Sequence, residues 1–134
     1  MADNHAKEVI NEFFKRVATA QDTLQIAELV SPNVDWFIAG DTLHVPWIGK
    51  KVGREGAAEF YSQIRAQIHS EQFLIGDTLV HDNRVLVTGS LASRVIRTGK
   101  LINTEFIFDF TVKEGLITRF RLFEDSYAVS QACI

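Results

Sequence analysis

Apolar residues recur at helical spacing in three stretches of the first half of the chain. Over residues 4–20 they stand three and four positions apart, which predicts an amphipathic helix. Asp22 is a suitable N-cap for a second, shorter helix over residues 24–30, and Pro32 is expected to end that helix. The same spacing over residues 54–68 predicts a third helix.

The second half of the chain has the pattern of β-sheet, because runs rich in β-branched and aromatic residues alternate with turns of two or three residues. Such short turns join antiparallel neighbours, since a parallel pair needs a long crossover. Helices followed by an antiparallel meander define an α+β domain, and no linker or repeat divides residues 1–134. An irregular stretch is expected between the first strand and the third helix. The expected strands cover residues 34–39, 73–80, 84–97, 101–113 and 116–124.

Aromatic residues are abundant for a small domain, with ten Phe and two Trp among 134 residues. Either these rings fill a thick core, or some of them line a hollow. The run at Gly89-Ser90-Leu91-Ala92-Ser93 has small residues where a filled core favours large ones. A hollow opposite these residues is one interpretation, and a bend packed against Phe side chains is the other.

Charge and cysteine content narrow the class of protein. A net charge of −3 does not favour nucleic acid as a partner, and no apolar run approaches the length of a membrane span. The first residues lack the pattern of a signal peptide, so export is not expected. Cys133 is the single cysteine, which excludes an internal disulfide and fits a reducing cytoplasm.

Three stretches resemble the SnoaL-like group of the nuclear transport factor 2-like superfamily, which also contains the ketosteroid isomerases and limonene epoxide hydrolases. They are AQDTLQIAELVSPNVDWFIAG at residues 20–40, PWIGKKVGREGAAEFYSQI at 46–64 and VKEGLITRFRLFED at 112–125. The resemblance implies a cone-shaped barrel, in which a curved, mixed sheet wraps around N-terminal helices in the order α-α-β-α-β-β-β-β (a cystatin-like roll). It also implies an apolar pocket at the wide end and a homodimer formed through the sheet face.

The resemblance also identifies catalytic groups of the relatives that this chain lacks. The Tyr and the base carboxylate of the ketosteroid isomerases fall on Phe14 and Trp36. The Asp that stabilises their enolate falls on Ile107 or Phe108. None of these side chains can accept the proton, and Phe has no hydroxyl to donate, so steroid isomerisation by that mechanism is not expected. Of the epoxide hydrolase relay, only Asp125 remains.

The SnoaL-type polyketide cyclases need one acid/base Asp near the end of the last strand, and Asp125 occupies the matching place. Partial desolvation beside Phe123 would raise its pKa and suit it to proton transfer. The alternative is that Asp125 caps a terminal helix over residues 126–132. His44, in the loop before the third helix, is a second candidate for proton transfer, although an exposed loop histidine is the commoner outcome.

Aromatic and basic side chains are candidates for ligand binding. Trp36 and Trp47 are expected to stack on a ligand, Phe14 to face the pocket, and the Tyr61 hydroxyl to reach it. Arg121 shares a strand face with Arg119 and Asp125 by period-two alternation, and in the pocket it would hold the Asp125 carboxylate ionised.

The sequence thus predicts a protein that binds an apolar, oxygen-bearing small molecule, with cofactor-free acid/base catalysis of the cyclase, isomerase or hydrolase type through Asp125. The alternatives are a non-catalytic binder and a dimeric protein-interaction module. No metal is expected, because His69 and His81 belong to no cluster with ligand spacing.

Overall fold

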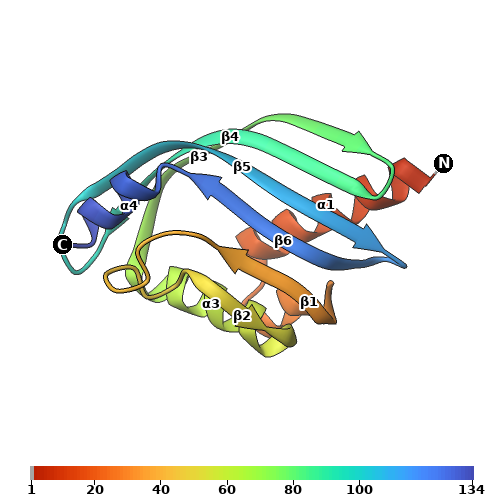
Figure 1. Cartoon of the computed structure of the whole chain (residues 1–134), viewed down its shortest axis with the longest axis horizontal. Helices are drawn as coiled ribbons and strands as arrows, with labels where there is room; N and C mark the ends of the chain where they lie inside the picture. The colour runs from red at the N-terminus through yellow and green to blue at the C-terminus, as the bar shows by residue number, and fades with distance from the viewer. Residues whose placement is uncertain (1) are drawn as a thin grey trace.

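The computed structural model describes the backbone of residues 2–134 and the side chains of residues 5–134. Helices α1 and α2 come first, the short hairpin β1–β2 and helix α3 follow, and a meander β3–β6 leads to helix α4 (Figure 1). No described helix is long and apolar enough to cross a membrane. The elements are α1 (Ala2–Thr19), α2 (Thr23–Ala27), β1 (Val30–Ile38), β2 (Gly49–Val52), α3 (Gly53–Gln67), β3 (Ile68–His81), β4 (Arg84–Val95), β5 (Leu101–Lys113), β6 (Leu116–Glu124) and α4 (Ser126–Ala132).

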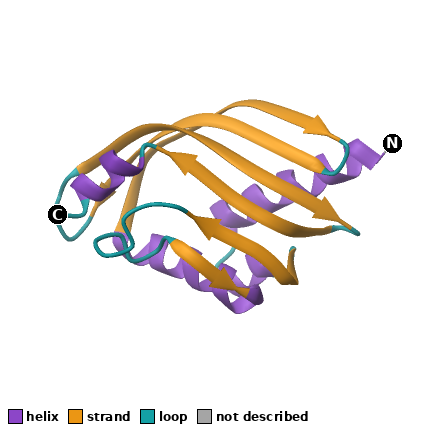
Figure 2. Cartoon of the chain, viewed as in Figure 1, coloured by secondary structure: helices purple, strands orange, loops and turns teal. Residues whose placement is uncertain are grey.

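The strands form one open, curved sheet in the order β2-β1-β6-β5-β4-β3. Neighbouring strands are antiparallel, except that β1 runs parallel to β6. Helices α1 and α3 cover one face of this sheet, and α4 lies at the end where β6 finishes (Figure 2). The α+β cone expected from the sequence is therefore confirmed, with a mixed sheet that does not close.

The second helix is shorter than the sequence predicts. Asp22 caps it as expected, and its carboxylate accepts a hydrogen bond from the Leu24 N–H at 2.9 Å. The helix ends at Ala27, and Pro32 lies inside β1 instead of ending the helix. Strand β1 tolerates this proline because its pairing with β6 is interrupted between Val30 and Asp35, where no ladder hydrogen bond is lost.

Two further boundaries differ from the expected ones. Strand β2 occupies four residues of the stretch expected to be irregular, and its length is too short for an alternation to be recognised. Strand β3 begins at Ile68, directly after α3, several residues before the expected start. Most of β3 is exposed on both faces because it forms an edge of the sheet, so its sequence shows little alternation.

The core lies between the sheet and the two long helices, and aromatic rings fill its centre. On β5, Phe106, Phe108 and Phe110 point inward and are buried, while the alternate residues face outward. The Trp36 and Phe120 rings stack with centroids 3.6 Å apart. Part of the aromatic surplus is therefore a thick core, and the rest surrounds the cavity described next.

Candidate functional site

A cavity of about 730 Å³ lies between the inner face of the sheet and helices α1 and α3. Its lining comes mainly from apolar side chains of both helices and of strands β3 to β6. This volume is in the range of pockets that enclose small organic molecules. Apolar residues of the lining include Phe14, Trp47, Phe60, Phe108, Leu122 and Val129.

Only part of the run of small residues on β4, residues 89–93, lines this cavity. Leu91 and Ser93 line it, as the hollow interpretation expects. Gly89 does not, because the Phe106 ring covers it so closely that an added Cβ would lie 2.4 Å from a ring atom. At Gly89 the structure therefore has a strand packed against Phe, and the hollow begins two residues later.

Glu124, the last residue of β6, is the one residue of the described part of the chain that contributes a carboxyl group to the cavity lining. It follows Phe120 and Leu122 at period two, so its side chain points to the inner face. Burial raises its pKa from 4.5 to about 7, and no hydrogen bond or cation from residues 5–134 opposes this effect. Near neutral pH both protonation states are populated, which is the condition for efficient acid/base catalysis.

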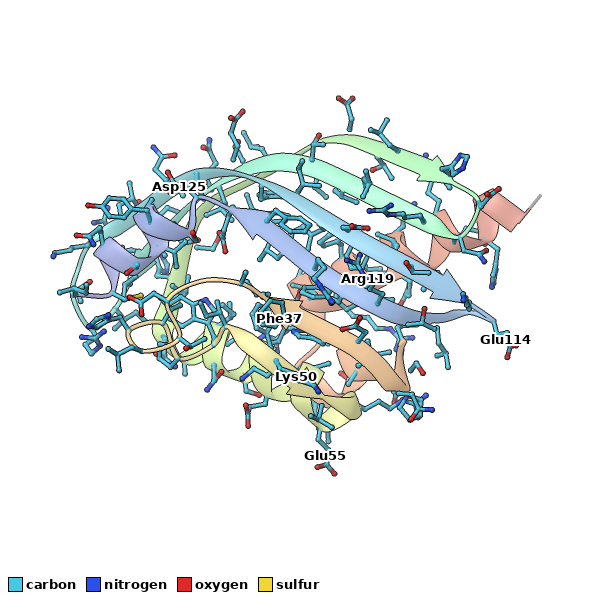
Figure 3. The ribbon with its side chains drawn as sticks, viewed as in Figure 1. Phe37, Lys50, Glu55, Glu114, Arg119 and Asp125 are labelled. Atoms are coloured by element: carbon cyan, nitrogen blue, oxygen red, sulfur yellow. The ribbon has the colours of Figure 1, made fainter. Side chains whose placement is uncertain are left out.

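Asp125, the predicted catalytic acid, is exposed and does not line the cavity. Its carboxylate accepts a hydrogen bond from the Ala128 N–H at 3.0 Å and thereby caps α4. Its own N–H donates to the Thr104 hydroxyl. Figure 3 shows Asp125 where β6 passes into α4. The geometry is that of the capping alternative, because Asp125 is one residue beyond Glu124 and outside the strand.

His44, the second predicted catalytic residue, also lies outside the cavity lining. Its Nδ1 is 2.7 Å from Asp41 Oδ2, and Ser130 donates a hydrogen bond to the same oxygen at 2.6 Å. These contacts, that of Ser130 first, lower the pKa of Asp41 to about 2. Because Ser130 bonds to the carboxylate and not to the imidazole, the group lacks the nucleophile–base contact of a hydrolase triad. The hydrogen bonds of Asp41 with His44 and Ser130 hold the 40–48 loop against α4.

Three of the predicted ligand-binding residues, Phe14, Trp47 and Tyr61, line the cavity. Trp36 lies outside the lining, where it contacts Phe60, Tyr61 and Phe120. Its Nε1 is buried without a hydrogen-bond partner among the described residues. Burial raises the pKa of Tyr61, so its hydroxyl stays protonated and can donate a hydrogen bond.

Arg121 is on the opposite face of the sheet from the cavity. Its guanidinium donates to the Asp35 carboxylate at 2.9 Å and lies 5.6 Å from the centre of the Phe37 ring. Phe37 and Arg119 are on this outer face, turned away from the helices (Figure 3). The period-two argument placed Arg121 and Arg119 together correctly, but the face they share is not the lining of the cavity.

The outer face also holds a carboxylate with a full set of partners. Asp109 is 3% exposed, and its two oxygens accept hydrogen bonds from Arg84 at 2.9 and 2.7 Å. Arg119 donates a third at 3.0 Å. These bonds, that from Arg84 first, hold the pKa of Asp109 below its usual value. We interpret this group as structural, because both of its oxygens accept hydrogen bonds from neighbouring side chains.

Sequence reasoning missed Glu124 by one position. The signal was present in the period of two that joins Phe120, Leu122 and Glu124 on one side of β6. It was obscured because Phe123, on the other side, is also a large apolar residue.

Comparisons with solved structures agree with the fold. An NTF2-like protein from Burkholderia xenovorans LB400 superposes with a TM-score of 0.90 at 20% identity, covering 100% of this chain and 99% of that one. TerC, co-crystallised with polyporic acid, gives 0.80 at 20% identity over 96% and 98% of the chains. A Catenulispora acidiphila DSM 44928 protein with a ketosteroid isomerase-like fold, in complex with trimethylamine, gives 0.74 at 11% identity over 94% and 92%.

At these identities the solved structures establish the fold alone. A search of curated protein sequences finds no significant match. The sequence itself matches the SnoaL-like domain over residues 10–120, which is most of its length. The chain therefore belongs to the SnoaL-like domain family.

Proposed function

We propose that the protein binds an apolar small molecule with a carbonyl group in the cavity and that Glu124 transfers a proton on it. The observation that carries this proposal is the Glu124 carboxyl, which lies in a mostly apolar lining, has no hydrogen-bond partner among the described residues and has a pKa of about 7. Structural carboxylates are normally paired, as Asp109 is. A buried carboxyl with a perturbed pKa in a cavity is a functional candidate.

In the proposed reaction the Glu124 carboxylate removes a proton from the carbon next to the carbonyl. The electron pair of the broken C–H bond moves to the carbonyl oxygen and gives an enolate. The Tyr61 hydroxyl donates a hydrogen bond to that oxygen, and stabilisation of such a charge in a water-poor site lowers the barrier. The protonated Glu124 then returns the proton in one of two ways. Protonation of another carbon of a conjugated enolate gives an isomerisation. If the enolate carbon instead attacks a second carbonyl of the same molecule, the new C–C bond closes a ring, and Glu124 protonates the alkoxide oxygen that forms.

Aromatic side chains would hold the body of the ligand. Trp47 and Phe14 lie on the cavity lining, and offset or edge contacts with a ring of the ligand are favourable. Trp36 would support this lining from behind through its contacts with Phe60 and Tyr61. That TerC, a structural neighbour, was co-crystallised with polyporic acid supports a small molecule as the occupant of such a fold.

Hydrogen–deuterium exchange of β-tetralone, an apolar ketone with acidic protons, tests the proposal in D2O by proton NMR. We expect the protein to accelerate exchange, with a rate that rises with pH through about 7 as Glu124 ionises. Glu124→Gln is expected to reduce the catalysed rate by at least about 100-fold, because general acid/base catalysis contributes factors of this size.

Two further variants make this test specific. Glu105→Gln removes a carboxylate from an exposed outward position of β5 and should leave exchange unchanged. If Asp125→Asn reduces the exchange rate and Glu124→Gln does not, Asp125 is the acid/base, as the sequence alone predicts. If β-tetralone binds without any accelerated exchange, the protein is the non-catalytic binder of the alternative hypothesis.

We also propose that the protein is a cytoplasmic homodimer formed through the outer face of the sheet. This face carries three partly exposed apolar residues, Phe37, Ile107 and Phe123, at 39%, 41% and 52% exposure. These residues lie on three neighbouring strands. Phe37 on β1 pairs with Arg121 on β6, and Phe123, two residues further along β6, pairs with Ile107 on β5.

Light scattering tests the dimer and should give twice the mass of one chain. The Ile107→Lys variant should have the mass of a monomer. An unchanged mass with this variant would count against the outer face as the interface.

A further inference from the structure

The polar groups of the cavity are distributed unevenly between its two sides. Asn11 and Lys15 line it from α1, and Arg65 lines it from α3. Asn11 and Lys15 are four residues apart, so their side chains lie on the same face of the helix, one turn apart. Within residues 5–134, no acidic residue of α1 or α3 lines the cavity.

Two observations indicate that these cations are available to a ligand. Among the described residues, no carboxylate lies within ion-pair distance of Lys15, and Glu12 on the same helix is bonded to Arg16 at 2.8 Å. Arg65 donates to the backbone carbonyls of Val17 at 3.0 Å and of Gln21 at 3.3 Å. These two bonds fix the guanidinium, and the remaining three of its five N–H groups are free to bind a ligand.

The cationic side and Glu124 are separate. Glu124 comes from the end of β6, in the sheet, and burial alone accounts for its raised pKa. Lys15 and Arg65 come from helices α1 and α3, which form the wall of the cavity across from the sheet. Arg65 acts on Tyr61, one turn earlier on α3. A ligand bound between the two sides would therefore meet positive charge at one end and Glu124 at the other.

We propose that the ligand is an apolar carboxylate whose anionic head binds Asn11, Lys15 and Arg65 and whose body extends toward Glu124. The position of the reacting carbon at Glu124 rests on the proposed function, whereas binding of the head does not. A negative head placed beside Glu124 would meet like-charge repulsion, so only one orientation is favourable. Lys15 is the specificity-determining residue, because its ammonium selects an anion over a neutral ligand of the same shape.

Fluorescence titration with pyrenebutyric acid and pyrenebutanol tests this selectivity, because the two probes share an apolar body and differ in the head. Near neutral pH we expect the acid to bind about tenfold more tightly, which corresponds to one charge-assisted hydrogen bond. The preference should weaken as salt is added, because the head site is open to solvent. Equal affinities for the two probes, or no binding of either, would overturn the proposal.

Substitutions assign the preference to its residue. Lys15→Met should remove most of the tenfold difference while affinity for the alcohol stays the same, and Lys15→Glu should reverse the preference. Lys7→Met, an exposed position on the same helix outside the lining, is the matched control and should change neither affinity. Glu124→Gln should keep the preference for the acid, so that a failure of catalysis is distinguished from a failure of head-group binding. A preference that survives Lys15→Met would contradict the role of this residue.

Discussion

The two faces of the sheet shift the pKa of a carboxyl group in opposite directions. On the outer face Asp109 is almost fully buried, yet its pKa is lowered because Arg84 and Arg119 donate three hydrogen bonds to it. On the inner face Glu124 has no such partner, and burial raises its pKa to about 7. Asp109 is on β5 and Glu124 is on the adjacent strand β6.

The difference shows that burial alone does not identify a functional carboxyl. The partners decide its protonation state, and a carboxylate whose acceptors are all occupied contributes to structure instead of chemistry. A group without partners costs stability in its charged form, and such a cost is typical of functional sites. Stability measurements can therefore test the assignment of each group without knowledge of the ligand.

The largest expected effect is on the pH dependence of stability. Because the pKa of Glu124 is raised from 4.5 to about 7, its contribution to the free energy of unfolding is complete below pH 4.5 and is lost as the pH rises through 7. The loss amounts to about 3 kcal/mol, at roughly 1.4 kcal/mol for each pKa unit. Urea unfolding of the wild type and of Glu124→Gln across this range should show the difference. Parallel curves for the two proteins would mean that Glu124 is not desolvated.

The opposite effect is expected at Asp109. Asp109→Asn removes the charge that three arginine N–H groups contact, and we expect the free energy of unfolding to fall by about 2 kcal/mol. Since the pKa of Asp109 is lowered, its contribution is present above its ordinary pKa of 3.8 and is lost as the pH falls further. Asp35→Asn breaks an exposed pair with Arg121 and is the control, with an expected loss of at most about 0.5 kcal/mol. Equal losses in the two variants would show that Asp109 is no more than a surface ion pair.

The smallest expected effect is at Asp125, which belongs to neither face. Asp125→Ala removes the N-cap of α4 and should lower the free energy of unfolding by about 1 kcal/mol. Asp22→Ala removes the corresponding cap of α2, where the hydrogen bond to Leu24 has a similar length, and gives a matched reference. A loss much larger than that of the reference would indicate a role for Asp125 beyond capping.

Local sequence patterns predicted most of the fold because its helices and several of its strands have clear periods. The pattern of residues 105–112 separated Phe106, Phe108 and Phe110 from Ile107 and Asp109. It did not tell which set faces the helices, since that choice depends on packing between distant segments. Strand β2 was missed because four residues are too few to show a period.

The candidate site was predicted in part. Phe14, Trp47 and Tyr61 line the cavity that the resemblance to a family implies, and their contact with a ligand stays a prediction. The sequence could not distinguish Glu124 from Asp125 as the candidate acid, because the two carboxylic acids are neighbours where β6 ends. A single residue separates the inner face from the helix cap, and only three-dimensional contacts distinguish the two.

The two tryptophans give the protein an internal optical probe for ligands. Trp36 is stacked on Phe120 in the core and is 1% exposed, so its emission should change mainly when the chain unfolds. Trp47 is equally shielded from water but borders the cavity, so an incoming molecule should alter its emission while the fold stays intact. With Trp36→Phe the remaining signal belongs to Trp47 alone, and unlabelled compounds can be screened by their quenching of it before any substrate is known.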